Sequence, residues 1–340
     1  MKRSGLLSGR WLAALLTALA LAALLLASGV WWWLQHPLAL EADVIELSIE
    51  PGTSPREVAV AWTRAGVRTD PRWLAQWFRW SGDDRRIRAG SYEVHGGVTP
   101  RSLLAKMVQG EETFERVRLI EGWTFRQWRA ALAGAAQLRQ ATAGWTEAQI
   151  MSELGMSGMA AEGRFYPDTY LYSRGVSDLT VLRRASRAMQ DHLEAAWAQR
   201  AASLPLLDMN QALVMASIIE KETGLPADRG LIAGVFTNRI RLGMALQTDP
   251  TVIYGLGMNF DGNLRKRDLL ADTPFNTYTR KGLPPTPIAM PGKASLLAAV
   301  RPQSTSALYF VARGDGSSVF SASLTEHNQA VNRFQRKTDR

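Results

Sequence analysis

The sequence has no cysteine among its 340 residues, which excludes disulfide bonds and thiolate metal sites. Neither a glycine-rich phosphate loop ending in lysine nor a Gly-x-Ser-x-Gly turn is present. Histidine is scarce, and no His-Glu-x-x-His pattern occurs. We therefore expect no metal site and no cofactor. The four histidines are widely separated: His36, His95, His192 and His327.

Long basic runs are missing as well. The net charge is +9, yet the sequence contains no stretch of five basic residues. This argues against a dedicated nucleic-acid arm, and we expect no nucleic-acid partner. A positive charge spread along the chain permits attraction to anionic lipid or to an acidic polymer. A soluble surface that happens to be basic explains the charge equally well.

One long apolar run without a charge is present, at residues 12–34. At about 1.5 Å per residue, a helix of this length crosses a hydrocarbon core of about 30 Å. Because basic residues precede the run and acidic residues follow it, we expect a cytoplasmic tail at residues 1–11 and an external remainder. A cleaved signal peptide is the alternative, but its apolar core is usually shorter, and the three tryptophans Trp31, Trp32 and Trp33 make a poor cleavage site. The flanking charges are Lys2, Arg3 and Arg10 before the run, and Glu41, Asp43 and Glu46 after it.

Residues 41–118 predict a small α+β module. Alternating apolar residues at Ile45, Leu47 and Ile49 indicate a half-buried strand. Ser54 before Pro55 suits the N-cap of a helix, and a similar Thr-Pro-Arg turn recurs later in the module. Strand-turn-helix units of this kind resemble the LysM module, which binds N-acetylated glycan chains.

Aromatic residues gather in one helical stretch of this module. Trp73, Trp77 and Trp80 recur at helical spacing beside Phe78, which favours a place in the core for most of them. Stacking of these rings on sugars is the alternative.

The larger remaining part, residues 119–340, is organised around one apolar helix at residues 210–226. Asn210 suits its N-cap, and Gly224 and Pro226 suit its end. Glu220 follows two isoleucines in the last turn, where desolvation and the negative end of the helix dipole should both raise its pKa. A carboxyl group of this kind can act as a general acid. The plain alternative is a helix that ends in solvated charges.

Several other segments of this part carry specific polar or aromatic residues. Residues 246–255 contain a turn whose short polar side chains can hydrogen-bond hydroxyl and amide groups. Residues 275–288 are too rich in proline and glycine for regular helix, so we expect a stiff extended loop. Residues 162–172 suggest a surface loop and a short strand, and residues 308–320 predict a hairpin.

These motifs occur together in the chain: the loop at residues 162–170, ASIIEKETG at residues 216–224, LQTDPTVIYGLG at residues 246–257, Asn276-Thr277-Tyr278 with Gly282-Leu283-Pro284-Pro285, the strand at residues 308–312, and Glu326-His327-Asn328. In this combination the chain resembles the endolytic murein transglycosylases, the MltG or YceG-like family. The resemblance implies an α+β fold class: a transmembrane helix at residues 12–34, a LysM-like module at residues 41–118, and a larger α+β catalytic domain at residues 119–340.

The resemblance also implies a function. Such proteins are lyases that cleave the β-1,4 bond between N-acetylmuramic acid and N-acetylglucosamine in nascent peptidoglycan. They leave 1,6-anhydro ends and so terminate glycan strands. The implied location is the bacterial inner (cytoplasmic) membrane, crossed once, with the catalytic domain in the periplasm. The implied partners are peptidoglycan glycan strands, the membrane, and the penicillin-binding proteins that synthesise the strands. The catalytic glutamate of the family corresponds to Glu220.

A single carboxyl group fits this chemistry. Ordinary glycosidases use two carboxyls that flank the bond, whereas an attack by the sugar's own 6-hydroxyl needs no activated water. Glu220 and Glu222 point about 200° apart on a helix, so they cannot both face one sugar. We therefore expect Glu220 to act as acid and then base, and Glu222 to be structural, for example in a helix-end ion pair, with a second-choice role as the acid. The residues expected to hold the sugars are Gln247, Thr248, Asp249, Tyr254, Asn276 and Tyr278.

Two other functions remain open at this stage. A non-catalytic glycan-binding scaffold for wall synthases is compatible with the LysM-like module, but it gives no role to Glu220. A lysozyme-like hydrolase would leave reducing ends in place of anhydro ends.

Overall fold

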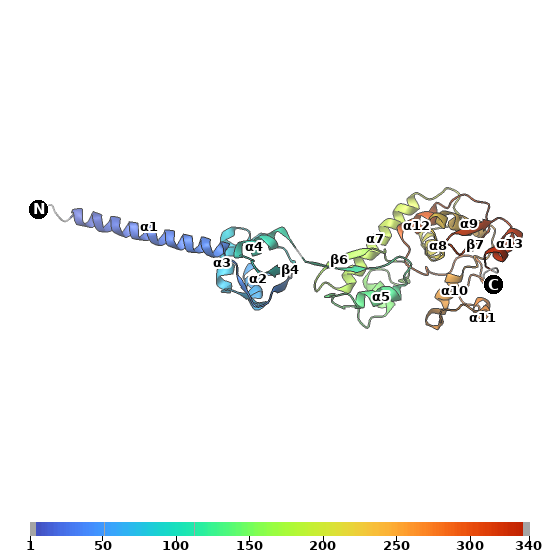
Figure 1. The fold of residues 1–340 in the computed structure, drawn as a ribbon, viewed down its shortest axis with the longest axis horizontal. Helices are drawn as coiled ribbons and strands as arrows, with labels where there is room; N and C mark the ends of the chain where they lie inside the picture. The colour runs from blue at the N-terminus through green and yellow to red at the C-terminus, as the bar shows by residue number, and fades with distance from the viewer. Residues whose placement is uncertain (1–4, 51, 112, 336–340) are drawn as a thin grey trace. The chain divides into compact units, whose positions relative to one another are not determined.

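The computed structural model describes residues 5–50, 52–111 and 113–335, with side chains from residue 11 onward. The chain mixes helices and short strands and divides into two compact units (Figure 1). The smaller unit contains the chain up to Glu115 together with Tyr172–Gly175, and the larger unit contains Arg116–Leu171 and the chain from Val176 onward. Lys2 and Arg3, which support the predicted membrane orientation, lie outside the described residues.

The smaller unit begins with one long helix, α1 (Gly5–Gln35). Within it, Trp11–Gln35 is long and apolar enough to cross a membrane, and none of the most apolar stretch is buried. This agrees with the predicted N-terminal apolar helix. The remaining elements of the unit are β1 (Ala39–Leu40), β2 (Val44–Ile49), α2 (Pro55–Arg64), β3 (Val67–Arg68), α3 (Pro71–Ser81), a 3₁₀ turn at Asp84–Arg86, β4 (Gly90–His95) and α4 (Pro100–Gln109).

Antiparallel pairing of β2 with β4 forms the sheet beneath α2 and α4. The expected alternation in β2 is present, since Ile45 and Ile49 are buried and face the core. Ser54 caps α2 as predicted, because its hydroxyl accepts the Glu57 N–H while the Glu57 carboxylate accepts the Ser54 N–H. Local hydrogen bonds of this kind fix where the helix begins.

The prediction that most aromatics of α3 lie in the core is wrong for two of them. Phe78 is fully buried, but Trp73 is 57% exposed and Trp80 is 60% exposed. The helical spacing correctly groups the tryptophans on one side of α3, but this side does not face the main core. With Trp77 they line an apolar cavity of about 410 Å³, whose other wall is α1 around Val30.

Helices make up most of the regular secondary structure of the larger unit. Its strands are short and form two-stranded sheets, one of β5 with β6 and one of β7 with β8. The elements are β5 (Phe114–Arg118) and β6 (Thr169–Ser173), which both cross the boundary between the units, then α5 (Phe125–Ala133), α6 (Glu147–Glu153), α7 (Asp178–Ala198), α8 (Met209–Glu222), α9 (Arg229–Arg241), α10 (Asp249–Leu256), α11 (Lys266–Leu270), α12 (Lys293–Val300), β7 (Tyr309–Ala312), β8 (Ser318–Ser321) and α13 (Leu324–Phe334).

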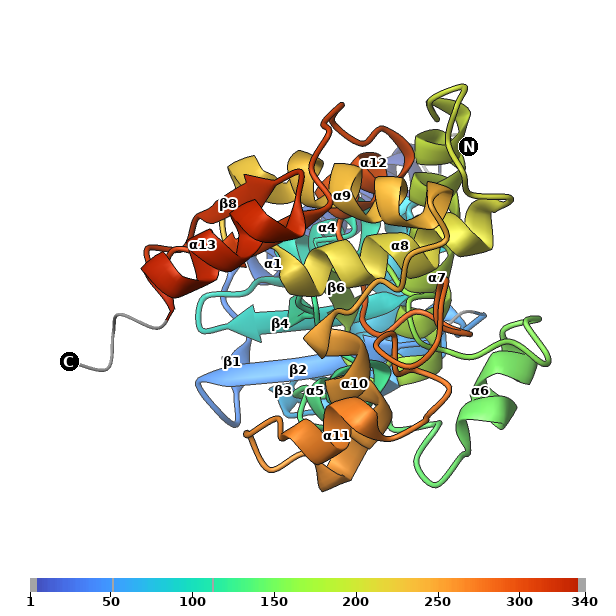
Figure 2. The ribbon, with the colours of Figure 1, turned by 90° about the vertical axis from the view of Figure 1, so that its right-hand side faces the viewer.

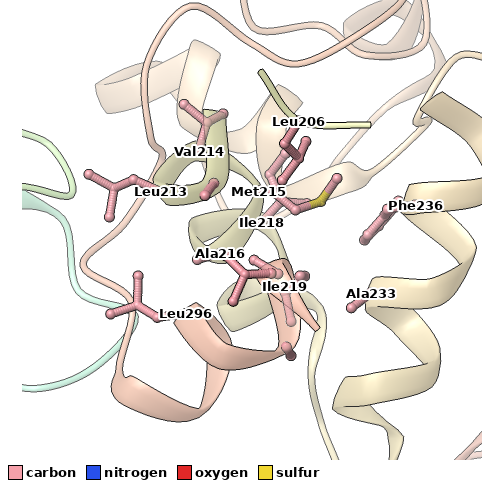
Figure 3. Packing of buried hydrophobic residues seen from close by; sticks show 14 of the residues in the cluster. Leu206, Leu213, Val214, Met215, Ala216, Ile218, Ile219, Ala233, Phe236 and Leu296 are labelled. Carbon is pink, nitrogen blue, oxygen red and sulfur yellow. The ribbon is translucent and has the colours of Figure 1, made fainter. Parts of the chain in front are cut away.

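Helix α8 is the centre of the larger unit. It packs against α7, α9 and α12 (Figure 2). Every residue from position 212 to position 219 is buried, as the apolar run predicts. The side chains spread around the helix to meet Phe236 of α9 and Leu296 of α12 (Figure 3). Each such buried aliphatic or aromatic side chain contributes about 1.5–3 kcal/mol, so the core holds α8 firmly in place.

The predicted N-cap of α8 is wrong by one half-turn. Asp208 is the cap, because its backbone is extended and its carboxylate accepts the Gln211 N–H at 2.8 Å. Asn210 already belongs to the helix, and its side-chain oxygen accepts a hydrogen bond from the Arg164 guanidinium.

Candidate active site

Glu220 lies in the last turn of α8, directly after the fully buried Ile218 and Ile219. The side chain is itself half-buried, and its Oε2 accepts the backbone N–H of Gly292 at 3.0 Å. Gly292 is the residue before α12, so α12 begins beside the end of α8. The central core therefore holds this carboxyl group at a fixed place near the surface.

A third segment, the loop at residues 120–124, also lies at the end of α8. Gly122 donates its N–H to the Met290 carbonyl at 2.8 Å, and Met290 donates its N–H to the Trp123 carbonyl at 2.8 Å. Lys221 of α8 also donates to the Gly122 carbonyl, at 3.3 Å. These bonds tie the loop to the end of α8 and to the segment that precedes α12.

Glu121 in this loop is a residue that sequence reasoning missed. Its carboxyl group lies against Gly292, where an added Cβ atom would be only 1.9 Å from its Oε1. Desolvation raises the pKa of Glu121, the charge of Glu220 raises it further, and Arg229 opposes the rise. The available signal was an acidic residue directly before a Gly-Trp turn, but nothing local in the chain indicates that this turn meets α8.

Glu222 lies two residues beyond Glu220 and has different neighbours. Its Oε1 accepts a hydrogen bond from the Thr248 hydroxyl, and Thr248 is 2% exposed. Burial raises the pKa of Glu222, and the charge of Asp249 adds to the rise. Within the described part of the chain Glu222 has no salt bridge, so the suggested helix-end ion pair is not found there. The two glutamates contact different segments.

The segment before α10 is bound to the loop that precedes the proline-rich stretch. Gln247 has a positive φ of 50°, an unusual value for a non-glycine residue, and its N–H donates a hydrogen bond to the Thr277 carbonyl at 3.1 Å. The Tyr278 hydroxyl donates to Asp249 Oδ1 at 2.6 Å. Burial and the neighbouring Asp249 both raise the pKa of Tyr278. The side chains of Gln247 and Asp249 are exposed, so both can reach a ligand.

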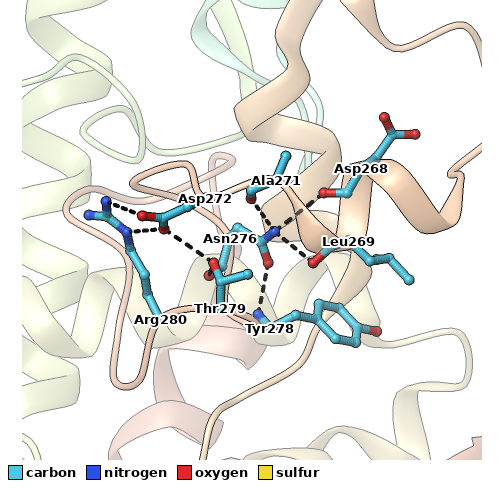
Figure 4. A network of polar contacts seen from close by, with 8 residues as sticks. All are labelled: Asp268, Leu269, Ala271, Asp272, Asn276, Tyr278, Thr279 and Arg280. Atoms are coloured by element: carbon cyan, nitrogen blue, oxygen red, sulfur yellow. Dashed lines mark hydrogen bonds and ion pairs between the residues drawn. The ribbon is translucent and has the colours of Figure 1, made fainter.

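Asn276 does not have the geometry of a sugar-binding residue. It is fully buried, and its side-chain amide donates to the backbone carbonyls of residues 268, 269 and 271 at 3.3, 3.0 and 2.6 Å (Figure 4). Its Oδ1 accepts the Tyr278 N–H at 2.9 Å. The amide is thus fully used inside the protein, where it shapes the loop and orients Tyr278.

The predicted surface loop at residues 162–172 is largely buried at its start. Glu162 is 5% exposed and accepts the Phe125 N–H at 3.0 Å, which ties it to the beginning of α5. Burial raises the pKa of Glu162 to about 8. Tyr254, another predicted sugar contact, hydrogen-bonds Glu162 and packs edge-on against Phe275. The aromatic and turn-forming residues at the start of this segment pack in the interior, so the prediction of a surface loop is wrong there.

By exposure, the predicted site residues fall into three groups. Gln247 and Asp249 are exposed, and Thr248 and Asn276 are buried. The half-buried residues are Glu220, Glu222, Tyr254 and Tyr278, and each of them also hydrogen-bonds another part of the protein. Across the described residues no group of His, Asp and Glu suited to a metal ion occurs. The accessible or half-buried side chains of the predicted site carry carboxyl, hydroxyl and amide groups.

Comparison with known proteins identifies the family of this chain. The model of the YceG-like family matches residues 47–333, and the chain belongs to this family. An endolytic murein transglycosylase of Bacillus subtilis (strain 168) is 29% identical over 308 residues, which cover 85% of this chain and 84% of that protein. The endolytic murein transglycosylase of Streptococcus pneumoniae serotype 2 is 24% identical over 321 residues, which cover 84% of this chain and 58% of that protein.

A solved structure agrees with the family assignment. The crystal structure of a YceG-like protein from Listeria monocytogenes matches with a TM-score of 0.54 and 28% sequence identity. The match covers 86% of this chain and 99% of that chain. The architecture is therefore the YceG-like fold.

Proposed function

We infer that this protein is an endolytic murein transglycosylase, a lyase that cuts peptidoglycan glycan strands. Its family membership and the name of its relatives support this function. The single structural observation that carries it is the position of Glu220, a partly accessible carboxyl group that directly follows the buried residues 212–219 of α8.

Glu220 acts in both halves of the proposed reaction. It first gives its proton to the oxygen that leaves as the β-1,4 bond between N-acetylmuramic acid and N-acetylglucosamine breaks. The muramyl 6-hydroxyl then bonds to its own anomeric carbon and returns a proton to Glu220. The product is an anhydro ring one water lighter than a hydrolysis product. Because nucleophile and electrophile belong to one sugar, the attack has a high effective molarity and needs no second carboxyl to activate water.

The sugars are held, in this proposal, by the accessible groups of the two hydrogen-bonded segments. Gln247 and Asp249 offer an amide and a carboxylate to hydroxyl and N-acetyl groups. Tyr278 contributes its ring and, through Asp249, a fixed hydroxyl. Thr248 and Asn276 do not contact the sugar in this proposal but hold the backbone of these segments in place. Glu222 and Tyr254 hydrogen-bond within the protein, Glu222 with Thr248 and Tyr254 with Glu162.

The remaining proposals concern location and partners. We propose that α1 crosses the bacterial inner membrane once, with the N-terminus in the cytoplasm and the larger unit in the periplasm. The length and composition of Trp11–Gln35 support this anchoring. We further propose that residues 41–118 bind glycan as a LysM-like module, and that penicillin-binding synthases are neighbours of the protein at the membrane. Exposed Trp73 and Trp80 support a role of the module in contact with sugar or lipid.

Cleavage of purified, uncrosslinked glycan strands by the full-length protein in detergent tests the function. Replacing Glu220 by glutamine is expected to abolish cleavage and leave strand binding in place, because the amide keeps the shape but has no proton to give. The matched control is Glu153→Gln, which removes one exposed carboxylate from α6. Full activity of the Glu220→Gln variant would show that a different residue is the general acid. Loss of activity in Glu222→Gln alone would identify Glu222 as the acid.

A further inference from the structure

The smaller unit carries an apolar face that its own core does not cover. Leu74 and Phe78 of α3 are fully buried in that core. Trp73 and Trp80, on a neighbouring side of the same helix, are more than half exposed, and Trp77 between them is half-buried. An exposed apolar face of this kind is typical of a contact site for a protein, a ligand or a membrane.

The three tryptophans line the apolar cavity of about 410 Å³ together with residues 25–34 of α1. Every α1 residue in this lining is leucine, valine, glycine or tryptophan. The indole N–H of Trp77, its only polar group, already donates to the Pro100 carbonyl at 3.1 Å. A sugar would lose hydrogen bonds to water here and find few in exchange, which costs free energy. The lining therefore favours a hydrocarbon over a glycan as the occupant.

The position of the cavity along α1 indicates which hydrocarbon is near. Trp11–Gln35 is the part of α1 that is long and apolar enough to cross a membrane. The lining residues 25–34 belong to the last part of this stretch and cover about 15 Å of it, at about 1.5 Å per residue. With α1 across the membrane, the tryptophans of α3 lie beside the C-terminal half of a hydrocarbon core of about 30 Å. Lipid acyl chains surround α1 at that depth.

The polar side of α3 suits a position at the lipid surface. At about 100° per residue, Arg72 and Arg79 lie about a third of a turn from the tryptophans, away from the buried side of the helix. Both arginines are exposed, and neither takes part in an ion pair within the described part of the chain. Guanidinium groups at the rim of an apolar face can bind lipid phosphates. Trp31 and Trp32 of α1 are also largely exposed, as in the aromatic belts at membrane interfaces.

We propose that α3 is a membrane-docking helix, whose tryptophan face enters the lipid leaflet next to the C-terminal end of α1, with an acyl chain in the cavity between the two helices. This rests on the proposed crossing of the membrane by α1. Trp73, Trp77 and Trp80 contact the acyl chains, while Arg72 and Arg79 bind the lipid phosphates. An amphipathic helix of this kind enters a bilayer by about 5–10 Å. The smaller unit is then held against the membrane by α3 as well as by α1.

Spin labels in vesicles test the docking, and single labelling sites are simple to introduce because the chain has no cysteine. Full-length protein with Trp80→Cys is labelled and reconstituted in vesicles of phosphatidylcholine and phosphatidylglycerol. The label is expected to collide more with oxygen, which concentrates in the bilayer, than with a water-soluble nickel complex. Phe114→Cys is the matched control, because Phe114 is an exposed aromatic residue of β5 in the same unit. Its label is expected to show the opposite preference.

Quenching of tryptophan fluorescence by brominated acyl chains gives a second test that needs no label. Trp73→Phe combined with Trp80→Phe keeps an aromatic ring at each position. If both residues lie in the bilayer, this double variant loses tryptophans that the lipid quenches, and its quenched fraction falls below that of wild type. If both lie in water, the quenched fraction rises, because Trp11, Trp31 and Trp32 of the apolar stretch remain beside lipid.

The possible results separate the docking from the anchoring on which it rests. A label on Leu21→Cys, near the middle of the apolar stretch, reports whether α1 crosses the membrane. A label in the bilayer at position 21 but in water at position 80, or a quenched fraction that rises in the double variant, overturns the docking alone. So does a label at position 80 that uncrosslinked glycan strands immobilise and that shows no preference for oxygen, because the face would then bind sugar. A label in water at position 21 removes anchor and docking together. None of these measurements uses glycan cleavage, so they are independent of the proposed catalytic function.

Discussion

Glutamine in place of Glu162 is expected to stabilise the protein, and increasingly so as the pH rises. Glu162 is 5% exposed, and burial raises its pKa from 4.5 to about 8. In the unfolded chain the carboxyl ionises near its ordinary value. Between about pH 4.5 and 8 the unfolded state has therefore lost a proton that the folded state keeps. Through this window the free energy of unfolding falls as the pH rises, by about 1.4 kcal/mol per pH unit.

At pH 7 this loss amounts to on the order of 3 kcal/mol, and it levels off above about pH 8. Glutamine has the same shape, and its side-chain oxygen can still accept the Phe125 N–H, so the variant avoids the loss. For a unit of this size, 3 kcal/mol corresponds to a rise in Tm of about 6–12 °C at pH 7, and no rise is expected near pH 4.5.

The assay is thermal unfolding of the full-length protein in detergent at several pH values between 5 and 8, followed by tryptophan fluorescence. Glu153→Gln is the control, because it removes an exposed carboxylate from α6. A Tm difference between Glu162→Gln and wild type that does not grow with pH would refute the reasoning. So would a variant that is less stable at every pH, since that would mean Glu162 is ionised in the folded protein.

Two further substitutions test the packing around the site. Asn276→Asp puts a carboxylate against the backbone carbonyls that the amide now binds, so the same unfolding assay should show a loss of stability of about 3 kcal/mol or more. A Tm within about 2 °C of wild type, which corresponds to under about 1 kcal/mol, would show that the loop does not depend on this amide. Gly163→Ala is expected to lower the free energy of unfolding by about 1–3 kcal/mol more than Gly144→Ala does. Both glycines have a φ of +78°, but the new methyl group at position 163 would lie 2.5 Å from Pro287, whereas nothing lies within 4 Å at position 144. Equal losses in the two glycine variants would mean that Pro287 gives way freely.

What the sequence predicts well is what depends on neighbouring residues. The cap of α2 follows from Ser54 and Glu57, which bond each other within one turn. The burial of α8 follows from an unbroken apolar run, and the irregular loop at residues 275–288 follows from its prolines and glycines. In these cases local chemistry leaves the backbone few choices.

What the sequence does not predict depends on contacts between distant segments. Asn276 has the look of a ligand-binding residue, but its partners are backbone carbonyls whose arrangement only the folded loop creates. Trp73 and Trp80 have core-like spacing, yet helical periodicity gives a face and does not say what the face meets. Glu121 and Glu220 both lie at Gly292, beside the hydrogen bonds of residues 122 and 123 with Met290, and neither segment carries a signal for this contact.

The end chemistry of the cut strands tests the central claim most directly. Full-length protein would digest uncrosslinked glycan strands in water labelled with heavy oxygen, and mass spectrometry would read the new ends. The account predicts 1,6-anhydro ends that carry no label and are one water lighter than hydrolysis products, with no new ends from Glu220→Gln. Labelled reducing ends would contradict it, because they would mean that water is the nucleophile and that a second carboxyl beside Glu220 activates it.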